Sequence, residues 1–274
     1  MTYQDYLGRT ETRTDTVWPL LVRGLTAALD LPDAGAVLPP LWHWMLFQDW
    51  APASGLGVDG HPKRGGFLPP VHHLPRRMWA GGRVEFVAPL LVGETVTRVS
   101  TIRSINEKSG GSGTLVFVTV GHEISGPNGV AIREEHDIVY RGTGGAAVKD
   151  AAAAPPPPEG ALVRTRTPDP VLLFRYSALT GNGHRIHYDL DYVTREEGYP
   201  GLVVHGPLQA TLLASLAAEA MPGAALRRFA YRGRRPAFHD RALTLVAVAG
   251  ADGVRVESRD ETGAVCMDGE ATLG

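Results

Sequence analysis

The sequence predicts an α+β fold, and two features carry that prediction. One long and almost wholly apolar segment, His205 to Met221, has the pattern of a buried helix. The second feature is a series of short, β-branched and alternating segments separated by turn residues, which is typical of antiparallel strands. The 33 glycines and 21 prolines agree with this prediction, because they favour turns and loops over long helical bundles.

The first half of the chain opens with one predicted helix and continues with predicted strands. The helix is expected from Thr16 to Asp30, where apolar residues recur at helical spacing. Pro39 and Pro40 then introduce a tryptophan-rich segment, Leu41 to Trp50. The strand-like segments alternate or are rich in β-branched residues; they are Arg83–Val87, Thr95–Ile105, Thr114–Val120 and Val130–Tyr140.

The second half repeats this theme around the long apolar segment. A short strand from Leu162 to Thr167 precedes a helix from Pro170 to Thr180, with Asp169 or Thr167 as its N-cap. A polar loop then leads to the predicted helix that starts near His205. The strands expected after it are joined by Gly or Asp-Gly turns; they are Arg228–Arg232, Ala242–Val248, Val254–Arg259 and Ala264–Thr272.

An Ala/Pro segment near the middle of the chain predicts a boundary between two units. Residues 151–158 read Ala-Ala-Ala-Ala-Pro-Pro-Pro-Pro. Four consecutive prolines cannot enter a helix interior or a central strand, and they favour extended polyproline II. We therefore expect a first unit over residues 1–142, a linker over 143–160 and a second unit over 161–274.

Composition and charge exclude several classes of protein. Hydrophobic residues make up 43% of the chain and charged residues 20%, as in a soluble globular protein. No apolar run is long enough to cross a bilayer, and the N-terminus does not resemble a signal peptide, so a cytoplasmic location is expected. A net charge of −2 argues against nucleic-acid binding. The single cysteine, Cys266, excludes an internal disulfide framework.

Residues suited to catalysis gather in two segments, Tyr176–Asp189 and Leu202–Leu208. An imidazole such as that of His187 can move a proton near neutral pH. The amide of Gly206, at the start of the long helix, could stabilise developing negative charge. The alternatives are that His187 is a solvated loop or helix-cap residue and that Gly206 only permits a turn. His184 and His187 with Asp189 form a weak metal-binding pattern that no Cys or Glu completes, so no metal is expected.

The same segments resemble the active-site segment of MaoC-like hotdog hydratases. That segment usually reads Ser-Gly-Asp-x-Asn-Pro-Ile-His and later Val-x-His-Gly-Met. The matching residues here are Thr180, Gly181, Asn182, His184, Arg185, Ile186 and His187, then Val203, His205 and Gly206. Four further segments resemble the double-hotdog branch that contains mesaconyl-C4-CoA and itaconyl-CoA hydratases: Leu38–Trp44, His61–Pro70, Leu74–Gly82 and Glu134–Tyr140. The resemblance implies a double hotdog, in which each half is an antiparallel sheet wrapped around a central helix.

The resemblance also implies roles in water addition to a conjugated thioester. In that family an aspartate and a histidine five residues apart handle the protons. Asn182 replaces the aspartate here, and a carboxamide cannot act as a general base near neutral pH. We therefore expect that His187 takes the proton from water, that Asn182 orients the water and that the amide of Gly206 holds the thioester oxygen. His205 is expected to shape the loop beside the substrate.

Charge changes in the motif favour an acyl group that carries a carboxylate. His184 and Arg185 replace the Asn-Pro pair of the common pattern, and Asn182 removes a negative charge. An aspartate would repel such a substrate, whereas Arg185 could hold its carboxylate with two hydrogen bonds. The alternative for Arg185 is a surface ion pair with a nearby aspartate, Asp189 or Asp191. Arg64 and Arg76 are candidates for the phosphates of coenzyme A, with solvated loops as the alternative.

The sequence thus predicts a hydratase, or a dehydratase working in reverse, that acts on a short branched dicarboxylic enoyl-CoA such as mesaconyl-C4-CoA or itaconyl-CoA. No cofactor is expected beyond the coenzyme A of the substrate, and the expected partner is that acyl-CoA thioester; a homodimer is left open. Three other functions are left open as well. They are a fatty-acid-type 3-hydroxyacyl-thioester dehydratase, a hotdog thioesterase and a non-catalytic acyl-CoA-binding protein.

Overall fold

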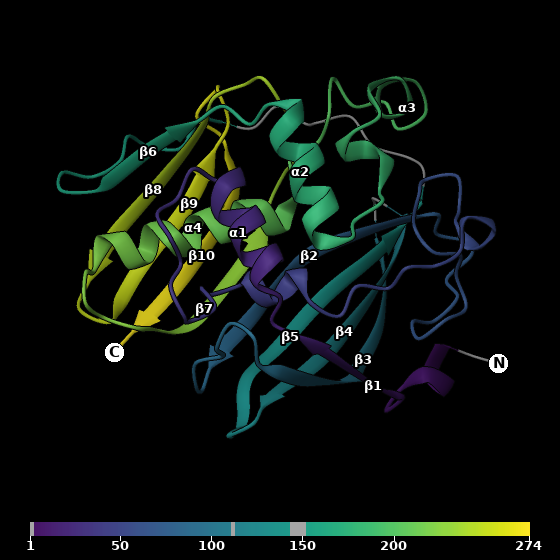
Figure 1. The fold of residues 1–274 in the computed structure, drawn as a ribbon. Helices are drawn as coiled ribbons and strands as arrows, with labels where there is room; N and C mark the ends of the chain where they lie inside the picture. The colour runs from purple at the N-terminus through teal and green to yellow at the C-terminus, as the bar shows by residue number, and fades with distance from the viewer. Residues whose placement is uncertain (1–2, 111–112, 143–151) are drawn as a thin grey trace.

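A single antiparallel sheet of ten strands organises the protein (Figure 1). The computed structural model describes residues 3–110, 113–142 and 152–274. The first half contributes β1 (Thr10–Thr16), β2 (Arg76–Phe86), β3 (Thr95–Gly110), β4 (Gly113–Gly126) and β5 (Gly129–Arg141). The second half contributes β6 (Leu162–Arg166), β7 (Leu226–Gly233), β8 (Leu243–Gly250), β9 (Gly253–Arg259) and β10 (Val265–Leu273).

The strand order shows that the two halves are structural repeats. The order is β1-β3-β4-β5-β2 in the first half and, counted from the opposite edge, β6-β8-β9-β10-β7 in the second. Each strand thus has a counterpart five strands later. The halves join where β2 and β7 pair antiparallel, with Gly82 opposite Tyr231. This arrangement confirms the α+β prediction and the double hotdog that the resemblance implies.

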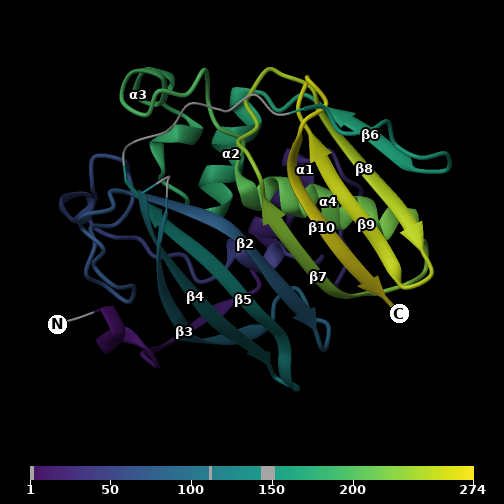
Figure 2. The ribbon, with the colours of Figure 1, turned by 180° about the vertical axis from the view of Figure 1, so that it is seen from behind.

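The central helix of the second half is α4 (Gly206–Ala220), which packs across β7 to β10 (Figure 2). Its residues are apolar on almost all sides, so nearly the whole helix is buried. Gln209, a buried polar residue on this helix, is satisfied because its Oε1 accepts a hydrogen bond from Ser258 Oγ at 2.8 Å. The long apolar segment therefore forms the helix that the sequence predicts.

Three further helices lie on the same side of the sheet as α4 (Figure 1). Helix α1 (Pro19–Ala28) contacts α2 (Pro170–Thr180), and α3 (Leu190–Arg195) follows the motif loop. Asp169 is the N-cap of α2, as predicted, since its carboxylate accepts a hydrogen bond from Leu172 N at 2.7 Å. The remaining helices are single 3₁₀ turns: η1 (Tyr3–Tyr6), η2 (Trp42–Met45), η3 (Ala53–Gly55) and η4 (Arg185–His187).

Two boundaries in the first half differ from the prediction. The helix expected from Thr16 begins only at Pro19, and the threonine-rich segment before it is β1, which pairs with β3. Threonine at alternate positions suits a strand on the edge of a sheet, a signal that the helical spacing of the following leucines obscured. The strand expected from Arg83 starts at Arg76 instead, and the Gly81-Gly82 pair lies inside β2.

Part of the predicted linker lies outside the described residues, namely residues 143–151. Residues 152–160 contain no helix or strand and run along the second half. The amide of Ala154 donates to Gly263 O at 2.9 Å, and Arg259 donates to Pro155 O at 2.7 Å. We propose the division of the chain at 1–142, 143–160 and 161–274 on this basis.

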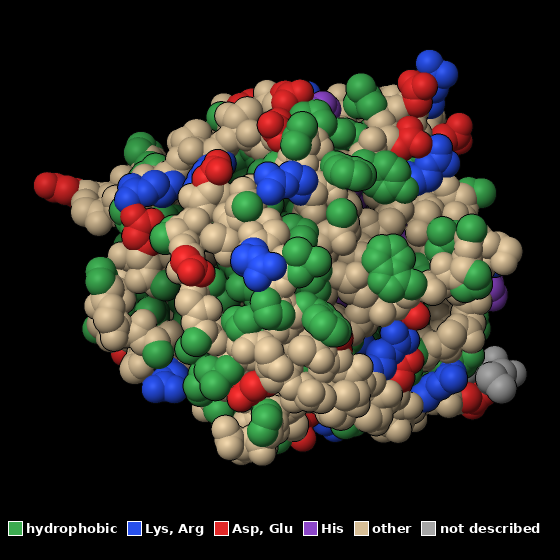
Figure 3. Space-filling model, in the orientation of Figure 1, with side chains coloured by type: hydrophobic (Ala, Val, Ile, Leu, Met, Phe, Trp, Pro, Cys, Tyr) green, Lys and Arg blue, Asp and Glu red, His purple; other side chains and the backbone are tan. Residues whose placement is uncertain are grey.

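The surface carries both signs of charge interspersed with apolar side chains, as Figure 3 shows for one face. None of the helices in the described part of the chain is long and apolar enough to span a membrane.

Candidate active site

The motif loop lies against the start of α4, as the sequence predicts. Helix α2 ends at Gly181, whose left-handed backbone (φ 62°) turns the chain into the loop. The loop then forms the 3₁₀ turn that ends at His187. The imidazole rings of His187 and His205 stack with centroids 3.6 Å apart, and His205 is the N-cap residue of α4. The predicted catalytic histidine is thereby held at the helix N-terminus.

His187 has the geometry of a neutral base. Its Nδ1 lies 2.7 Å from the carbonyl oxygen of Val203. Because a carbonyl can only accept, Nδ1 must carry the proton, and Nε2 keeps a free lone pair. Burial lowers the pKa of His187 to about 4, even though the bond to Val203 opposes this effect. The side chain is only 7% exposed, so the alternative of a solvated loop histidine is wrong.

His205 packs against the ring of His187. It has no exposed surface, and its Nε2 lies 2.8 Å from Ser177 Oγ on α2. Burial, together with the neighbouring histidines, holds the pKa of His205 well below its usual value. A neutral, packed imidazole in this place can fix the position of the His187 ring. The structure thus places His205 between Ser177 and the predicted catalytic residue His187, with no exposed surface of its own.

The backbone conformation at position 206 does not require a glycine. The φ of Gly206 is not in the left-handed region. A Cβ added there would make only ordinary contacts, the nearest with Trp79 Cε3 at 3.5 Å. The alternative that glycine only permits the turn therefore has no support in the geometry. An amide in the first turn of a helix has no acceptor inside that helix, so the N–H of Gly206 can serve a ligand oxygen.

Asn182 borders a cavity of about 220 Å³ between the two halves. Its Oδ1 accepts a hydrogen bond from the amide of His184 at 3.0 Å, which fixes the side chain. Among the described residues no acceptor is hydrogen-bonded to its amide nitrogen, so this group can donate to a water molecule. Pro207, the second residue of α4, borders the same cavity.

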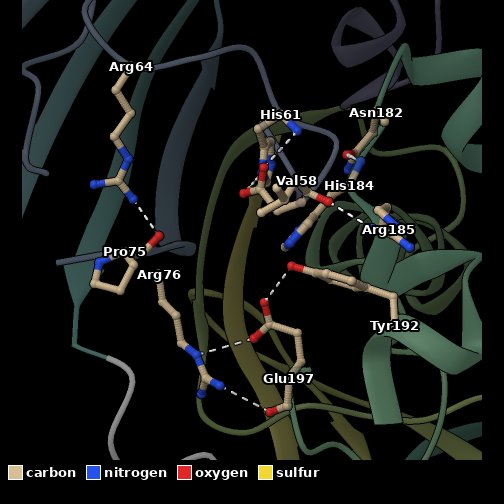
Figure 4. Close-up of polar contacts among 12 residues, drawn as sticks. Val58, His61, Arg64, Pro75, Arg76, Asn182, His184, Arg185, Tyr192 and Glu197 are labelled. Carbon is tan, nitrogen blue, oxygen red and sulfur yellow. Dashed lines mark hydrogen bonds and ion pairs between the residues drawn. The ribbon is translucent and has the colours of Figure 1, made fainter. Parts of the chain in front are cut away.

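A loop of the first half holds the motif loop in place (Figure 4). The carbonyl of Asp59 accepts from the amide of Arg185 at 2.9 Å. Gly60 has a φ of 86° and packs directly on Gly183, where a Cβ would come within 2.0 Å of the Gly183 oxygen. Only glycine fits such a backbone-to-backbone contact. The first half thus shapes the catalytic loop of the second.

This contact also creates an Asp-His-His cluster that the sequence analysis missed. Asp59 Oδ2 lies 2.9 Å from His61 Nδ1, and the rings of His61 and His184 have centroids 4.1 Å apart. Ligand atoms of these three residues lie within 4.8 Å of one another. Burial and the neighbouring histidines lower the pKa of His184 to about 2. No local spacing in the sequence predicts this set, because Asp59 and His61 belong to the other half of the chain.

The three arginines predicted to bind substrate all have protein partners. Arg185 pairs with Asp189 at 2.7 Å and lies over the ring of Tyr192, which agrees with the alternative left open for it. Arg64 donates to backbone carbonyls, among them Leu74 O at 2.8 Å. Arg76 forms an ion pair with Glu197 at 3.2 Å, and Figure 4 shows it directed toward that residue. Their roles toward coenzyme A or an acyl carboxylate stay predictions.

The first half supplies most of the cavity wall, and sequence reasoning missed these residues as well. They are polar or aromatic side chains of η2 and of strands β2 to β5: His43, Trp44, Trp79, Arg98, His122, Glu134 and His136. A signal was present, because Glu134 and His136 stand two residues apart in a strand and so share a face. Of the tryptophans in the segment Leu41 to Trp50, Trp42 is buried and Trp44 lines the cavity, whereas Trp50 is 75% exposed.

The fold and this site define a class of proteins: double-hotdog hydratases and dehydratases of acyl thioesters. The chain belongs to the hydroxyacyl-thioester dehydratase type 2 family, whose model matches residues 41–239. It is 45% identical to a mesaconyl-C4-CoA hydratase of Chloroflexus aurantiacus, over 98% of this chain and 97% of that protein.

Two solved structures show the same fold. HtdX of Mycobacterium tuberculosis superimposes with a TM-score of 0.69 at 18% identity, over 96% of this chain and 98% of HtdX. A second protein of that organism, described as having a double hotdog fold, gives a TM-score of 0.61 at 15% identity, over 99% of this chain and 98% of the other.

Proposed function

We propose that this protein hydrates a conjugated enoyl-CoA whose acyl group carries a carboxylate, such as mesaconyl-C4-CoA, or catalyses the reverse dehydration. The observation that carries the proposal is the neutral His187, fixed by Val203 at the N-terminus of α4. The relative at 45% identity is a hydratase of that substrate and spans nearly the whole chain, which supports the same substrate class here.

The first chemical step is the activation of water. Asn182 donates a hydrogen bond from its amide nitrogen to the water oxygen, and Nε2 of His187 removes one proton from it. The water oxygen forms a bond to the β-carbon as the C=C π electrons move toward the thioester. Since His187 is neutral when the substrate arrives, no prior deprotonation is needed.

The second step returns the proton. The electron pair displaced from the double bond collects on the thioester oxygen, and the N–H of Gly206 stabilises that charge at the positive end of the α4 dipole. The enolate then collapses and takes the proton from His187 at its α-carbon. The net change is the addition of one water molecule, with the base restored to its neutral form.

The cavity disfavours a fatty-acid-type substrate. A long alkyl chain would bury the Arg98 guanidinium and the His136 imidazole against hydrocarbon without hydrogen bonds. A thioesterase differs from a hydratase because it releases free thiol. A non-catalytic binder differs from both because it leaves the thioester unchanged.

The proposal is tested by mixing the purified protein with mesaconyl-C4-CoA, itaconyl-CoA or crotonyl-CoA. We expect loss of the absorbance of the conjugated thioester without release of free thiol, fastest with a carboxylated substrate. Release of thiol would identify a thioesterase, and an unchanged absorbance with all three substrates would refute hydratase activity. Faster conversion of crotonyl-CoA than of the carboxylated substrates would refute the carboxylated substrate class.

A further inference from the structure

A rung of polar side chains crosses the inner face of the first-half sheet. Ser100 on β3, His122 on β4 and Glu134 on β5 lie side by side in register. Within this rung, Ser100 Oγ and His122 Nδ1 are hydrogen-bonded at 2.9 Å. Arg98 and His136 stand two residues away from it on the same face, and both border the cavity. Positions on the inner face of a sheet normally hold apolar core residues, so this polar set calls for a ligand or an internal partner.

Glu134 already has its internal partners. Its Oε2 accepts from His43 at 3.1 Å and its Oε1 accepts from the Trp44 indole at 2.9 Å. Burial by itself raises the pKa of Glu134, but the bond to His43 and the surrounding imidazoles outweigh it and lower the pKa to about 2. Glu134 therefore stays a carboxylate whose two oxygens are both occupied by neighbouring donors.

The hydrogen-bond donors around it are not satisfied. Among the described residues that line the cavity, four buried side-chain nitrogens have no hydrogen-bond partner: His43 Nδ1, Trp79 Nε1, Arg98 Nε and His136 Nε2. Those of Trp79 and Arg98 can only donate. The Arg98 guanidinium lies over the ring of Phe47, 4.7 Å from its centroid, a contact that uses its face and leaves its N–H groups free. A buried donor without an acceptor costs about 1–3 kcal/mol. The donors of Arg98 and Trp79 thus have no acceptor, and a carboxylate brings two oxygens that accept.

We propose that this cavity binds the free carboxylate of the acyl group, with Arg98 as its charged partner, the indole N–H of Trp79 as a second donor and the His136 imidazole beside them. This inference rests on the proposed function, because Asn182 and Pro207 of the catalytic half border the same cavity. An acyl chain reaching in from the thioester at Gly206 would pass Asn182 and end among these donors. Arg98 thereby takes the role that the sequence analysis gave to Arg185, whose guanidinium is paired with Asp189.

The test uses two saturated thioesters that do not react, succinyl-CoA and butyryl-CoA. Both have four-carbon acyl chains, and they differ in a terminal carboxylate against a methyl group. By calorimetric titration the wild-type protein should bind succinyl-CoA at least about tenfold more tightly, since a charge-assisted hydrogen bond contributes about 1.5–3 kcal/mol. Arg98→Met should remove this preference by weakening succinyl-CoA alone.

Arg103→Met is the matched control, because Arg103 is an exposed arginine of the same strand. It should keep the wild-type preference. Equal affinities of the wild type for the two thioesters, or an unchanged preference in Arg98→Met, would overturn the inference. If Arg98→Met does not fold, Arg98→Lys is measured instead and should bind succinyl-CoA more weakly than wild type. Binding is measured without turnover, so a failure of the hydratase proposal would show separately in the absorbance assay.

Discussion

The two halves share one strand order but fill their inner faces differently. In the second half the inner face is covered by α4, whose buried leucines and alanines form an apolar core with β7 to β10. In the first half the corresponding face carries Arg98, His122, Glu134 and His136 around a cavity. The first-half helix α1 is shorter, with ten residues against fifteen, and contacts α2. One repeat thus keeps the long central helix, and the other provides room for a ligand.

This difference assigns separate tasks to the repeats. In the proposed function the second half carries the chemistry, because the N-terminus of α4 supplies a fixed amide and holds His187. The inner face of the first half carries polar groups in place of apolar core residues, and some of these groups have no hydrogen-bond partner. Burying them lowers the stability of the fold unless a ligand pairs with them. A repeat fold can therefore divide catalysis and recognition between two copies of one architecture. The following changes test this division.

The largest effect is expected from His187→Ala. Loss of the base should lower turnover by about 100-fold or more on carboxylated and neutral substrates alike, because the chemistry is common to both. His72→Ala, at an exposed position in the first half, is the control and should leave turnover unchanged. Steady-state kinetics decide the point. Turnover near the wild-type rate in His187→Ala would show that another group is the base, with His184 the next candidate.

A smaller effect, selective for the substrate, is expected from Asn182→Asp. The added carboxylate lies at the border of the cavity and should repel a carboxylated acyl group. We expect kcat/KM for mesaconyl-C4-CoA to fall about tenfold relative to that for crotonyl-CoA, which corresponds to about 1.4 kcal/mol. Asn182→Ala should instead lower kcat/KM for both substrates together. If Asn182→Asp changes kcat/KM for both substrates by a similar factor, the side chain at position 182 does not influence binding of the acyl carboxylate.

Acid should destabilise the protein through its buried histidines. Burial lowers the pKa of His187 to about 4 and that of His122 to about 3, whereas an unfolded imidazole titrates near 6.5. Between about pH 4 and 6.5 the unfolded chain binds more protons than the native one, so the free energy of unfolding rises with pH and levels off above this window. For His187 alone the loss at pH 5 is on the order of 2 kcal/mol.

Thermal unfolding measured from pH 5 to 8 checks this expectation, with His187→Ala giving a shallower dependence than wild type. A melting temperature that does not change between pH 7 and pH 5 would contradict the burial of neutral imidazoles.

The smallest effect is expected from Arg185→Leu. The Arg185 guanidinium is partly exposed and already pairs with Asp189, so its loss should change kcat/KM by about threefold or less on either substrate, as exposed ion pairs contribute little. The comparison of mesaconyl-C4-CoA with crotonyl-CoA is the readout. A strong loss of kcat/KM confined to the carboxylated substrate would show that Arg185, and not Arg98, binds the acyl carboxylate.

The sequence brought together the residues at the start of α4 but not those of the first-half cavity, for physical reasons. His187, Asn182 and Gly206 lie within 25 positions of one another in a recognisable motif, so local spacing was enough to bring them together. The polar and aromatic cavity residues of the first half come from η2 and four strands, and only the register of β3, β4 and β5 places Arg98, His122 and Glu134 on one face. Arg185 was predicted to bind the substrate because of its position in the motif. Its guanidinium instead forms an ion pair with Asp189, four residues later in the chain.

The most direct test of the division between the halves is a crystal structure of His187→Ala with mesaconyl-C4-CoA bound. We predict the thioester oxygen within hydrogen-bond distance of the Gly206 amide, about 3 Å, and the acyl carboxylate at the same distance from the Arg98 guanidinium. A carboxylate bound at Arg185, or an acyl group outside the first-half cavity, would contradict the account.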